Sequence, residues 1–180
     1  MNALPSHRPR PARARVPRVL PFLLACVMCT AVSPGARAQA PEWRSFQEAV
    51  AAAQKSGKAI LVDVYAPWCG WCRKMQTEVY TLPELREYLH EHFEIARLNL
   101  EEYSDTVTFK GYTLTSAELA MGLGASSTPT TVFLEPDGAY ITRLPGFHEG
   151  DVFMRVLRFI GTGAYRRLTY EEYLAQERDP

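Results

Sequence analysis

The first 38 residues of this chain contain no aspartate or glutamate, although the 180 residues as a whole carry 20 acidic and 20 basic side chains. Six arginines occupy that region, residues 19–32 are mostly apolar, and Ala36-Arg37-Ala38 provides small residues for cleavage. The combination is typical of a secretory signal peptide. We therefore expect residues 1–38 to be cleaved and the protein to be exported to the periplasm.

Long hydrophobic runs are missing as well. The apolar part of the leader has about 14 residues and contains Pro21, whereas roughly 20 residues are needed to span a bilayer. A retained leader that anchors the protein in the membrane stays open as an alternative. So does lipidation of Cys26, because the segment from Leu23 to Cys26 loosely resembles a lipobox.

A basic surface is not indicated either. Without the leader, the remaining 142 residues carry 14 basic and 20 acidic side chains, a net charge of about −6. A mildly acidic protein without a basic stripe is a poor partner for nucleic acid. The length suits one domain over residues 39–180, which we expect to be a monomer. We place its core at about residues 43–161 and a C-terminal helical extension at residues 162–180.

Cysteine is scarce: the chain has four, and two of them lie in the expected leader. The remaining pair, Cys69 and Cys72, cannot form a disulfide framework, and a bridge over two intervening residues constrains the unfolded chain little. Such a pair in an oxidising compartment is either catalytic or half of a metal site. Haem attachment is excluded, because it needs histidine where Arg73 stands. A zinc or copper site is disfavoured, since His90 and His92 lack finger spacing and no second C-x-x-C exists outside the expected leader.

The surroundings of this pair favour redox chemistry. Residues 60–65 form a continuous, β-branched apolar run, typical of a central strand covered on both faces, and a helical segment starts near Arg73. If Cys69 lies at the first turn of that helix, the free N–H groups and the helix dipole lower its thiol pKa from about 8.5 to roughly 3.5–7.5. Cys72, one turn later, can then close a disulfide with it.

The remaining pattern predicts alternating helices and strands. Helices are expected over residues 43–55, 83–92, 115–121, from 151 onward and over 169–177, and strands over residues 93–99, 130–134 and 139–144. Residues 101–114 have weak periodicity and are interpreted as a long surface insertion. This order describes a mixed α/β sheet with helices on both faces.

Four features in order resemble the thioredoxin superfamily. They are the segment 62–72, the strand 96–99, Thr128-Pro129-Thr130 before a strand, and Pro145-Gly146 after a hairpin. The resemblance implies a thioredoxin fold, a central mixed β-sheet flanked by helices, here with an insertion before the cis-Pro loop and an extra C-terminal helix. Within the superfamily, the insertion, residues 143–147 and the tail look like the exported SoxW-like thioredoxins associated with sulfur oxidation.

The resemblance also implies catalytic roles. Cys69 would attack a substrate disulfide as thiolate, and Cys72 would resolve the mixed disulfide. Asp63, expected to be buried in the sheet with a raised pKa, would exchange a proton with Cys72. The alternative is a partly solvated carboxylate paired with Arg97, which stands where the family has lysine and cannot release its proton at working pH.

A substrate-binding set follows from the same resemblance. The bond before Pro129 is expected to be cis, and Gly70-Trp71 replaces the usual Gly-Pro dipeptide, so a thioredoxin-like reduction potential cannot be assumed. Trp68 and Trp71 are candidates for an apolar docking surface, and Trp71 is the stronger candidate for exposure. The set comprises Trp68, Gly70, Trp71, Thr128, Pro129 and Gly146.

The expected function is thiol–disulfide exchange. We expect an oxidoreductase that reduces disulfides of periplasmic proteins through Cys69 and Cys72, receives electrons from a membrane-borne thiol donor, and has no cofactor beyond its redox-active disulfide. Two alternatives stay open: an oxidase or isomerase of the same fold, and a non-catalytic thiol or metal-binding module such as a copper handler.

Overall fold

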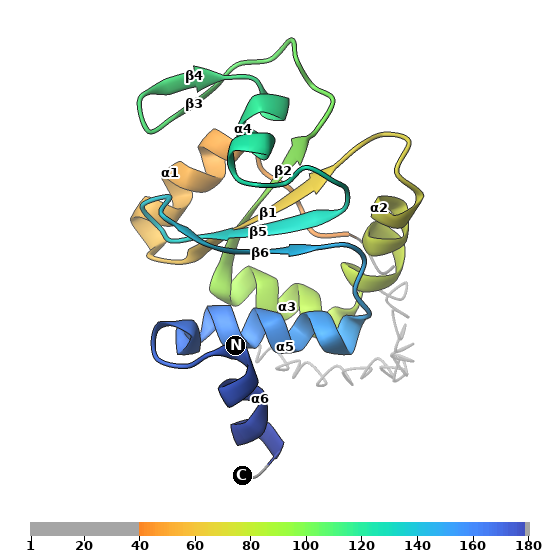
Figure 1. Cartoon of the computed structure of the whole chain (residues 1–180), viewed down its shortest axis with the longest axis vertical. Coiled ribbons are helices and arrows are strands. Elements are labelled where there is room, and N and C mark those ends of the chain that lie inside the picture. The colour runs from red at the N-terminus through yellow and green to blue at the C-terminus, as the bar shows by residue number, and fades with distance from the viewer. Residues whose placement is uncertain (1–39, 179–180) are drawn as a thin grey trace, which may run out of the picture. The chain divides into compact units, whose positions relative to one another are not determined.

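The computed structural model describes residues 40–178, so the expected leader and its cleavage site lie outside the described residues. A four-stranded sheet with the order β2-β1-β5-β6 forms the centre of this part (Figure 1). Its strands are β1 (Ala59–Tyr65), β2 (Phe93–Asn99), β5 (Thr130–Leu134) and β6 (Tyr140–Pro145). β1 runs parallel to β2 and antiparallel to β5, and β5 pairs antiparallel with β6. The prediction of a mixed α/β thioredoxin fold is confirmed.

Helices cover both faces of the sheet. In Figure 1, α3 (Pro83–His92) and α5 (Gly150–Gly161) lie below it, and α1 (Phe46–Ser56) and α4 (Ser116–Gly122) lie above it. The side chains of β1 alternate between the two cores: Ile60, Val62 and Val64 pack with α1 and α4, and Leu61 packs with α3 and α5. Burial on both faces explains why this strand is a continuous apolar run.

The first helix begins later than predicted. α1 starts at Phe46 and not at residue 43, because Ser45 and Glu48 form a capping box: the Ser45 hydroxyl accepts from the Glu48 N–H, and the Glu48 carboxylate accepts from the Ser45 N–H. The segment before the cap runs along the edge of the sheet, where the Arg44 N–H donates to the Ile95 carbonyl at 3.1 Å. Trp43 therefore lies outside the helix.

The insertion contains a β-hairpin, which its weak periodicity did not indicate. β3 (Val107–Phe109) and β4 (Tyr112–Leu114) are joined by Lys110 and Gly111, both with positive φ, as a two-residue type I′ turn requires. Phe109 packs edge-on against Phe46, with ring centroids 5.1 Å apart, which holds the hairpin on α1.

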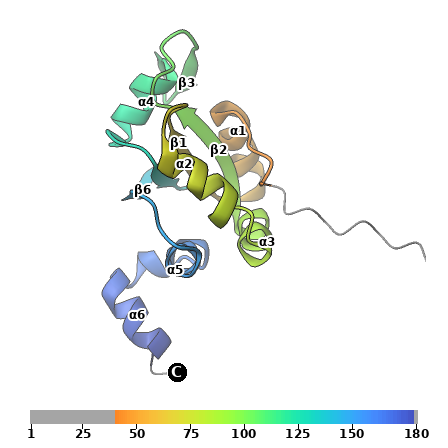
Figure 2. The same ribbon diagram turned by 90° about the vertical axis from the view of Figure 1, so that its right-hand side faces the viewer.

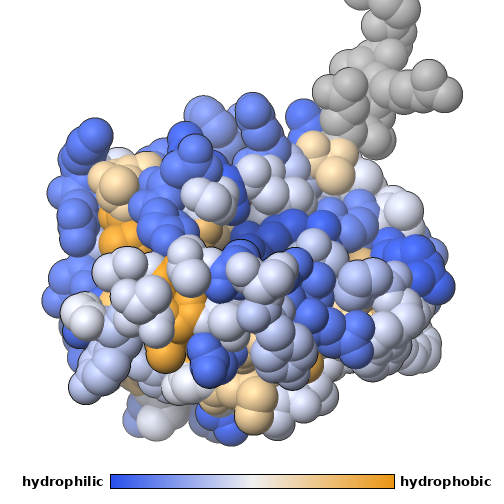
Figure 3. Space-filling model, turned by 90° about the horizontal axis from the view of Figure 1, so that it is seen from above, coloured by the Kyte–Doolittle hydropathy of each residue, from blue (hydrophilic) through white to orange (hydrophobic). Residues whose placement is uncertain are grey.

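The surface of the domain that faces upward in Figure 1 is mostly hydrophilic, with small separate apolar areas (Figure 3).

The C-terminal tail packs on the domain. A 3₁₀ turn, η2 (Ala164–Arg166), leads into α6 (Tyr170–Arg178), and the rings of Tyr165, Tyr170 and Tyr173 lie between 5.3 and 6.4 Å from Phe159 of α5. Figure 2 shows α6 beside α5, at the end of the molecule away from β3 and α4. Within residues 40–178, none of the helices is long and apolar enough to cross a membrane.

Candidate active site

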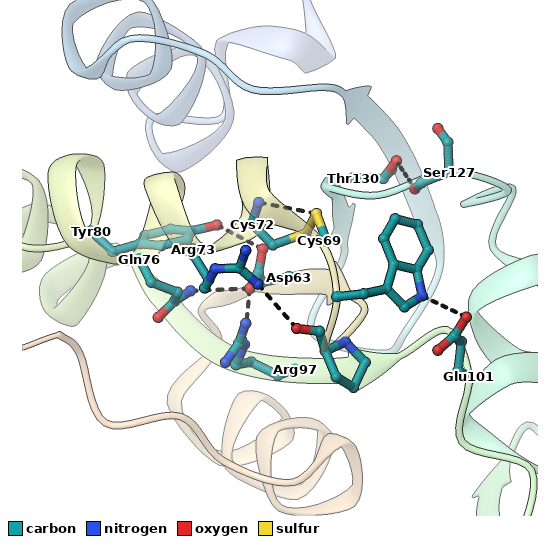
Figure 4. The surroundings of a disulfide bond; sticks show 12 residues. Asp63, Cys69, Cys72, Arg73, Gln76, Tyr80, Arg97, Glu101, Ser127 and Thr130 are labelled. Carbon is teal, nitrogen blue, oxygen red and sulfur yellow. Dashed lines mark hydrogen bonds and ion pairs between the residues drawn. A yellow bond between two sulfur atoms is a disulfide. The ribbon is translucent and has the colours of Figure 1, made fainter.

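The two cysteines lie at the start of a short helix directly after β1. Cys69 is the N-cap of α2 (Gly70–Lys74), which continues as a π-helical turn, η1 (Met75–Val79). Cys69 and Cys72 form a disulfide, and the Cys72 N–H donates to Sγ of Cys69 at 3.0 Å (Figure 4). An amide N–H directed at this sulfur stabilises a thiolate there once the bond is reduced.

Asp63 is buried in the sheet near this disulfide, as Figure 4 shows. It is 1% exposed and accepts three hydrogen bonds: Nε of Arg97 donates to Oδ2 at 2.9 Å, Nε2 of Gln76 donates to Oδ2 at 3.2 Å, and the Tyr80 hydroxyl donates to Oδ1 at 3.3 Å. Burial raises the pKa of this carboxyl above its ordinary value, and the charge and hydrogen bonds of Arg97 oppose the rise. The predicted raised pKa is confirmed.

The predicted alternative for Asp63 is partly right. The carboxylate is paired with Arg97, its neighbour across the β1–β2 ladder, but it is not solvated. The guanidinium also lies over two aromatic rings, 3.8 Å from the centroid of Tyr65 and 5.5 Å from that of Trp43. Stacking on both rings fixes the direction in which Nε points.

The sequence did not indicate the other two hydrogen-bond donors to Asp63. Gln76 lies in η1, four residues after Cys72, and Tyr80 follows directly after η1. Burial, followed by the charge of Asp63, raises the pKa of Tyr80 well above its ordinary value, so its hydroxyl is a neutral donor. The spacing from Cys72 to Gln76 was the one available signal, because residues i and i+4 share a helix face.

The Thr128–Pro129 peptide bond is cis, as predicted. The Gly146 N–H donates to the Pro129 carbonyl at 2.8 Å, which ties the end of β6 to this loop. Ser127 and Thr130, on either side of the cis bond, are among the residues around the disulfide in Figure 4. Thr128 Oγ1 is buried and has no hydrogen-bond partner within the part of the chain that the structure describes.

Both tryptophans of the motif are exposed. Trp68 is 66% exposed and its indole N–H donates to Oε1 of Glu101 at 2.6 Å. Trp71 is 58% exposed and lies against Phe147, with ring centroids 5.4 Å apart. The Lys74 ammonium lies 4.6 Å from the Phe147 centroid. Trp71 is exposed, as expected, and Trp68 is exposed as well, because Glu101 holds its ring at the surface.

The two histidines that a metal site would need lie at the end of α3, away from the cysteines in the chain. Among residues 40–178, no three His, Cys, Asp or Glu side chains come close enough together to hold a metal ion.

Most of this domain matches a known protein family. Residues 46–161 match the family model described as a thioredoxin-like domain. The match includes the disulfide, Asp63, the insertion and the cis-proline loop. The SoxW-like subgroup stays a prediction.

Individual relatives agree with this match. Thioredoxin-like protein 1 of Schizosaccharomyces pombe is 32% identical over 105 residues, which cover 58% of this chain and 30% of that protein. Disulfide bond reductase DsbH of Chlamydia pneumoniae is 24% identical over 110 residues, 61% of this chain and 64% of that protein. The chain thus spans less than two thirds of the length of either relative. The solved structure of a thioredoxin-fold protein from Helicobacter pylori is 30% identical and superimposes with a TM-score of 0.55, covering 67% of this chain and 80% of that one.

Proposed function

Since this chain belongs to the thioredoxin-like domain family, we propose that it is a thiol–disulfide oxidoreductase that reduces disulfide bonds of periplasmic proteins. One observation carries the proposal: the disulfide of Cys69 and Cys72 lies at the start of α2, with the Cys72 N–H directed at Sγ of Cys69 and the buried Asp63 carboxyl nearby. A site of this kind contains a nucleophile, a resolving thiol and a group that can take a proton.

The first step breaks the substrate disulfide. The Cys69 thiolate attacks one substrate sulfur, a mixed disulfide forms between Cys69 and that sulfur, and the second substrate sulfur leaves as a thiolate. The Cys72 N–H, 3.0 Å from Sγ of Cys69 in the oxidised protein, favours the thiolate over the thiol at Cys69 before the attack.

The second step releases the substrate. Asp63 accepts the proton of the Cys72 thiol, and the resulting thiolate attacks Sγ of Cys69. The Cys69–Cys72 bond forms, the mixed disulfide breaks and the remaining substrate sulfur leaves as a thiolate. The substrate has gained two electrons and the protein has lost two.

A donor must then return two electrons to the disulfide. A membrane-borne thiol donor suits a protein exported by residues 1–38, or anchored through that leader or a lipidated Cys26. The disulfide is the redox group, and no further cofactor is required. The name of the DsbH relative, a disulfide bond reductase, supports the reductive direction over the oxidase or isomerase direction.

The exposed side of the site is the proposed contact surface for protein substrates. Trp68 and Trp71 present large apolar rings to solvent beside the cysteines. Gly70, Thr128 and Gly146 complete the proposed surface, since Gly70 is exposed in the motif and Gly146 is bonded to the cis-proline loop. Pro129 is itself buried and would act by shaping this loop. Interface energy concentrates on such aromatic anchors.

Trapping of mixed disulfides tests the roles of the two cysteines. Cys72→Ser should accumulate mixed disulfides with protein substrates, because nothing resolves them, whereas Cys69→Ser should trap few. The double variant Cys69→Ser/Cys72→Ser is the matched control and should trap none. Equal trapping by both single variants would contradict the assignment of Cys69 as the nucleophile.

Metal analysis of the purified protein tests the whole class of function. The proposal predicts a free dithiol in the reduced protein. Stoichiometric zinc or copper that is lost in Cys69→Ser and in Cys72→Ser would contradict the redox function and favour a metal-binding module.

A further inference from the structure

Trp43 contacts all three side chains that donate hydrogen bonds to Asp63. Its indole N–H donates to Oε1 of Gln76 at 3.2 Å. Its ring lies edge-on to Tyr80, with centroids 4.9 Å apart, and the Arg97 guanidinium lies 5.5 Å from its centroid. Trp43 precedes both α1 and residues 46–161, so it lies outside the part of the chain that the family model matches.

The contact between Trp43 and Gln76 fixes which end of the amide meets Asp63. A carboxamide has one acceptor end and one donor end, and either end can bond to a carboxyl group, depending on whether that group carries a proton. The indole N–H can only donate, so it holds Oε1 and leaves Nε2 directed at Oδ2 of Asp63. In this orientation Gln76 bonds to the carboxylate and has no acceptor free for a protonated carboxyl.

We propose that Trp43 is a positioning residue for the buried Asp63, and that it acts by locking the Gln76 amide in the orientation that donates to the charged carboxylate. Trp43 does not touch the cysteines in this role. It restricts the orientation of the Gln76 amide, which in turn contacts the Asp63 carboxyl.

The other groups that face Asp63 do not depend on this amide. From β2, Arg97 donates to Oδ2, and a guanidinium has no acceptor, so its polarity cannot reverse. Tyr80 bonds to the opposite oxygen, Oδ1, and Thr131, opposite Asp63 on β5, is uncharged. Cys72 is bonded to Cys69 in the oxidised protein and has no thiol to titrate. Of the two side chains that donate to Oδ2, only Gln76 can turn and become a hydrogen-bond acceptor.

The catalytic consequence rests on the proposed function. A carboxylate that accepts the proton of Cys72 must be ionised when the mixed disulfide forms. Because burial raises the pKa of Asp63, an amide locked in its donating orientation extends this step to lower pH.

Titration of the Asp63 carboxyl carbon by ¹³C NMR in the oxidised protein tests the proposal. Trp43→Phe keeps an aromatic ring beside Tyr80 and Arg97 and removes the indole N–H together with one of the two fused rings, so the double-mutant cycle below separates the two losses. The freed amide can then turn and accept a hydrogen bond from protonated Asp63. We expect the pKa of Asp63 to rise by about 0.5 to 1 pH unit.

A double-mutant cycle shows whether Gln76 carries the effect. In a Gln76→Leu background, Trp43→Phe should cause no further change, because the amide is gone. Gln76→Met serves the same purpose if the leucine variant does not fold. Tyr165→Phe is the matched control, since it removes another aromatic hydrogen bond, to Glu135 at 2.7 Å, and should leave the titration of Asp63 unchanged.

Three results would overturn the positioning role: an Asp63 titration that is unchanged in Trp43→Phe, a pKa of Asp63 that falls in this variant, or a rise that persists in full without Gln76. The titration needs no turnover. A protein with the expected shift but no disulfide exchange would therefore refute the proposed function alone, and an active protein without the shift would refute the role of Trp43 alone.

Discussion

The two sides of the Cys69–Cys72 disulfide differ in burial and in chemistry. On the inner side, Asp63 is 1% exposed and is bonded to Arg97, Gln76 and Tyr80. On the outer side, Trp68 and Trp71 are more than half exposed. On the inner side, the Asp63 carboxyl can change the protonation of the Cys72 thiol, and this effect does not depend on the substrate. The outer side can act only on substrates large enough to reach it.

Replacing the inner carboxyl should have the largest effect. Asp63→Asn keeps the size of the side chain, replaces one acceptor oxygen by an amide donor and removes the proton acceptor. We expect the resolving step to slow by about 10²-fold at pH 7, both for a protein disulfide and for glutathione disulfide. Stopped-flow kinetics with the two substrates provide the measurement. If Asp63→Asn slowed the reaction with the protein substrate alone, the inner side would act on substrate binding, and the assignment of Asp63 to proton transfer would be contradicted.

Removing the outer rings should have a smaller and more selective effect. Trp68→Ala is expected to raise KM for a protein disulfide about 10-fold, the size of a moderate interface anchor, and to leave the rate with glutathione disulfide unchanged. Tyr112→Ala, at a tyrosine that is 69% exposed on the β3–β4 hairpin, is the matched control and should change neither. Equal losses with both substrates would show that Trp68 acts on the chemistry.

The raised pKa of Asp63 should also appear in the stability of the oxidised protein. Between the unfolded and folded pKa values of Asp63, the folded state binds more protons than the unfolded state, so stability falls as the pH rises through this window. Asp63→Asn removes the buried charge and should increase the free energy of unfolding on the order of 1 kcal/mol at pH 8. The gain should shrink as the pH falls toward 3.8, the ordinary pKa of aspartate.

Denaturant unfolding at several pH values measures this difference. A gain that is constant with pH, or a loss of stability at pH 8, would show that Arg97 outweighs burial in setting the protonation of Asp63. Asp105→Asn, at a side chain that accepts from the Ser116 N–H at 2.8 Å far from the disulfide in the chain, controls for the change of residue type.

The contact between Trp68 and Glu101 should have the smallest effect. Glu101→Ala removes the acceptor of the indole N–H, so the ring is free to leave its present position. We expect KM for protein disulfides to rise about two- to fivefold, in line with one exposed hydrogen bond, without change for glutathione disulfide. Glu101→Gln keeps an acceptor and should restore most of the affinity. Failure of the glutamine variant to do so would point to the charge of Glu101 itself.

Periodicity and motif order predicted most of the elements, because their signals are local. The run over residues 60–65 alternates between two cores, and Pro83 begins a helix at the position that proline favours. The cis bond at Pro129 was available only through the resemblance, since composition and spacing carry no information on it.

Three features were missed in the sequence. Trp43 continues the helical spacing of Phe46, and the periodicity was followed past the capping box of Ser45 and Glu48, a local signal that places Trp43 outside α1. The hairpin over residues 107–114 has strands of three residues each, too short for a clear alternation. The donors on Asp63 come from β2, η1 and the residue after η1, and their meeting point depends on the packing of α2 and η1 against the sheet.

The reduction potential of the Cys69–Cys72 pair, measured by equilibration with glutathione buffers, tests the central claim most directly. Gly70 and Trp71 separate the cysteines and set how strongly the thiolate of Cys69 is stabilised. A reductase of exported proteins requires a potential well below about −200 mV, and this is the predicted result. A potential near about −120 mV would mark an oxidase and contradict the proposed direction of electron flow.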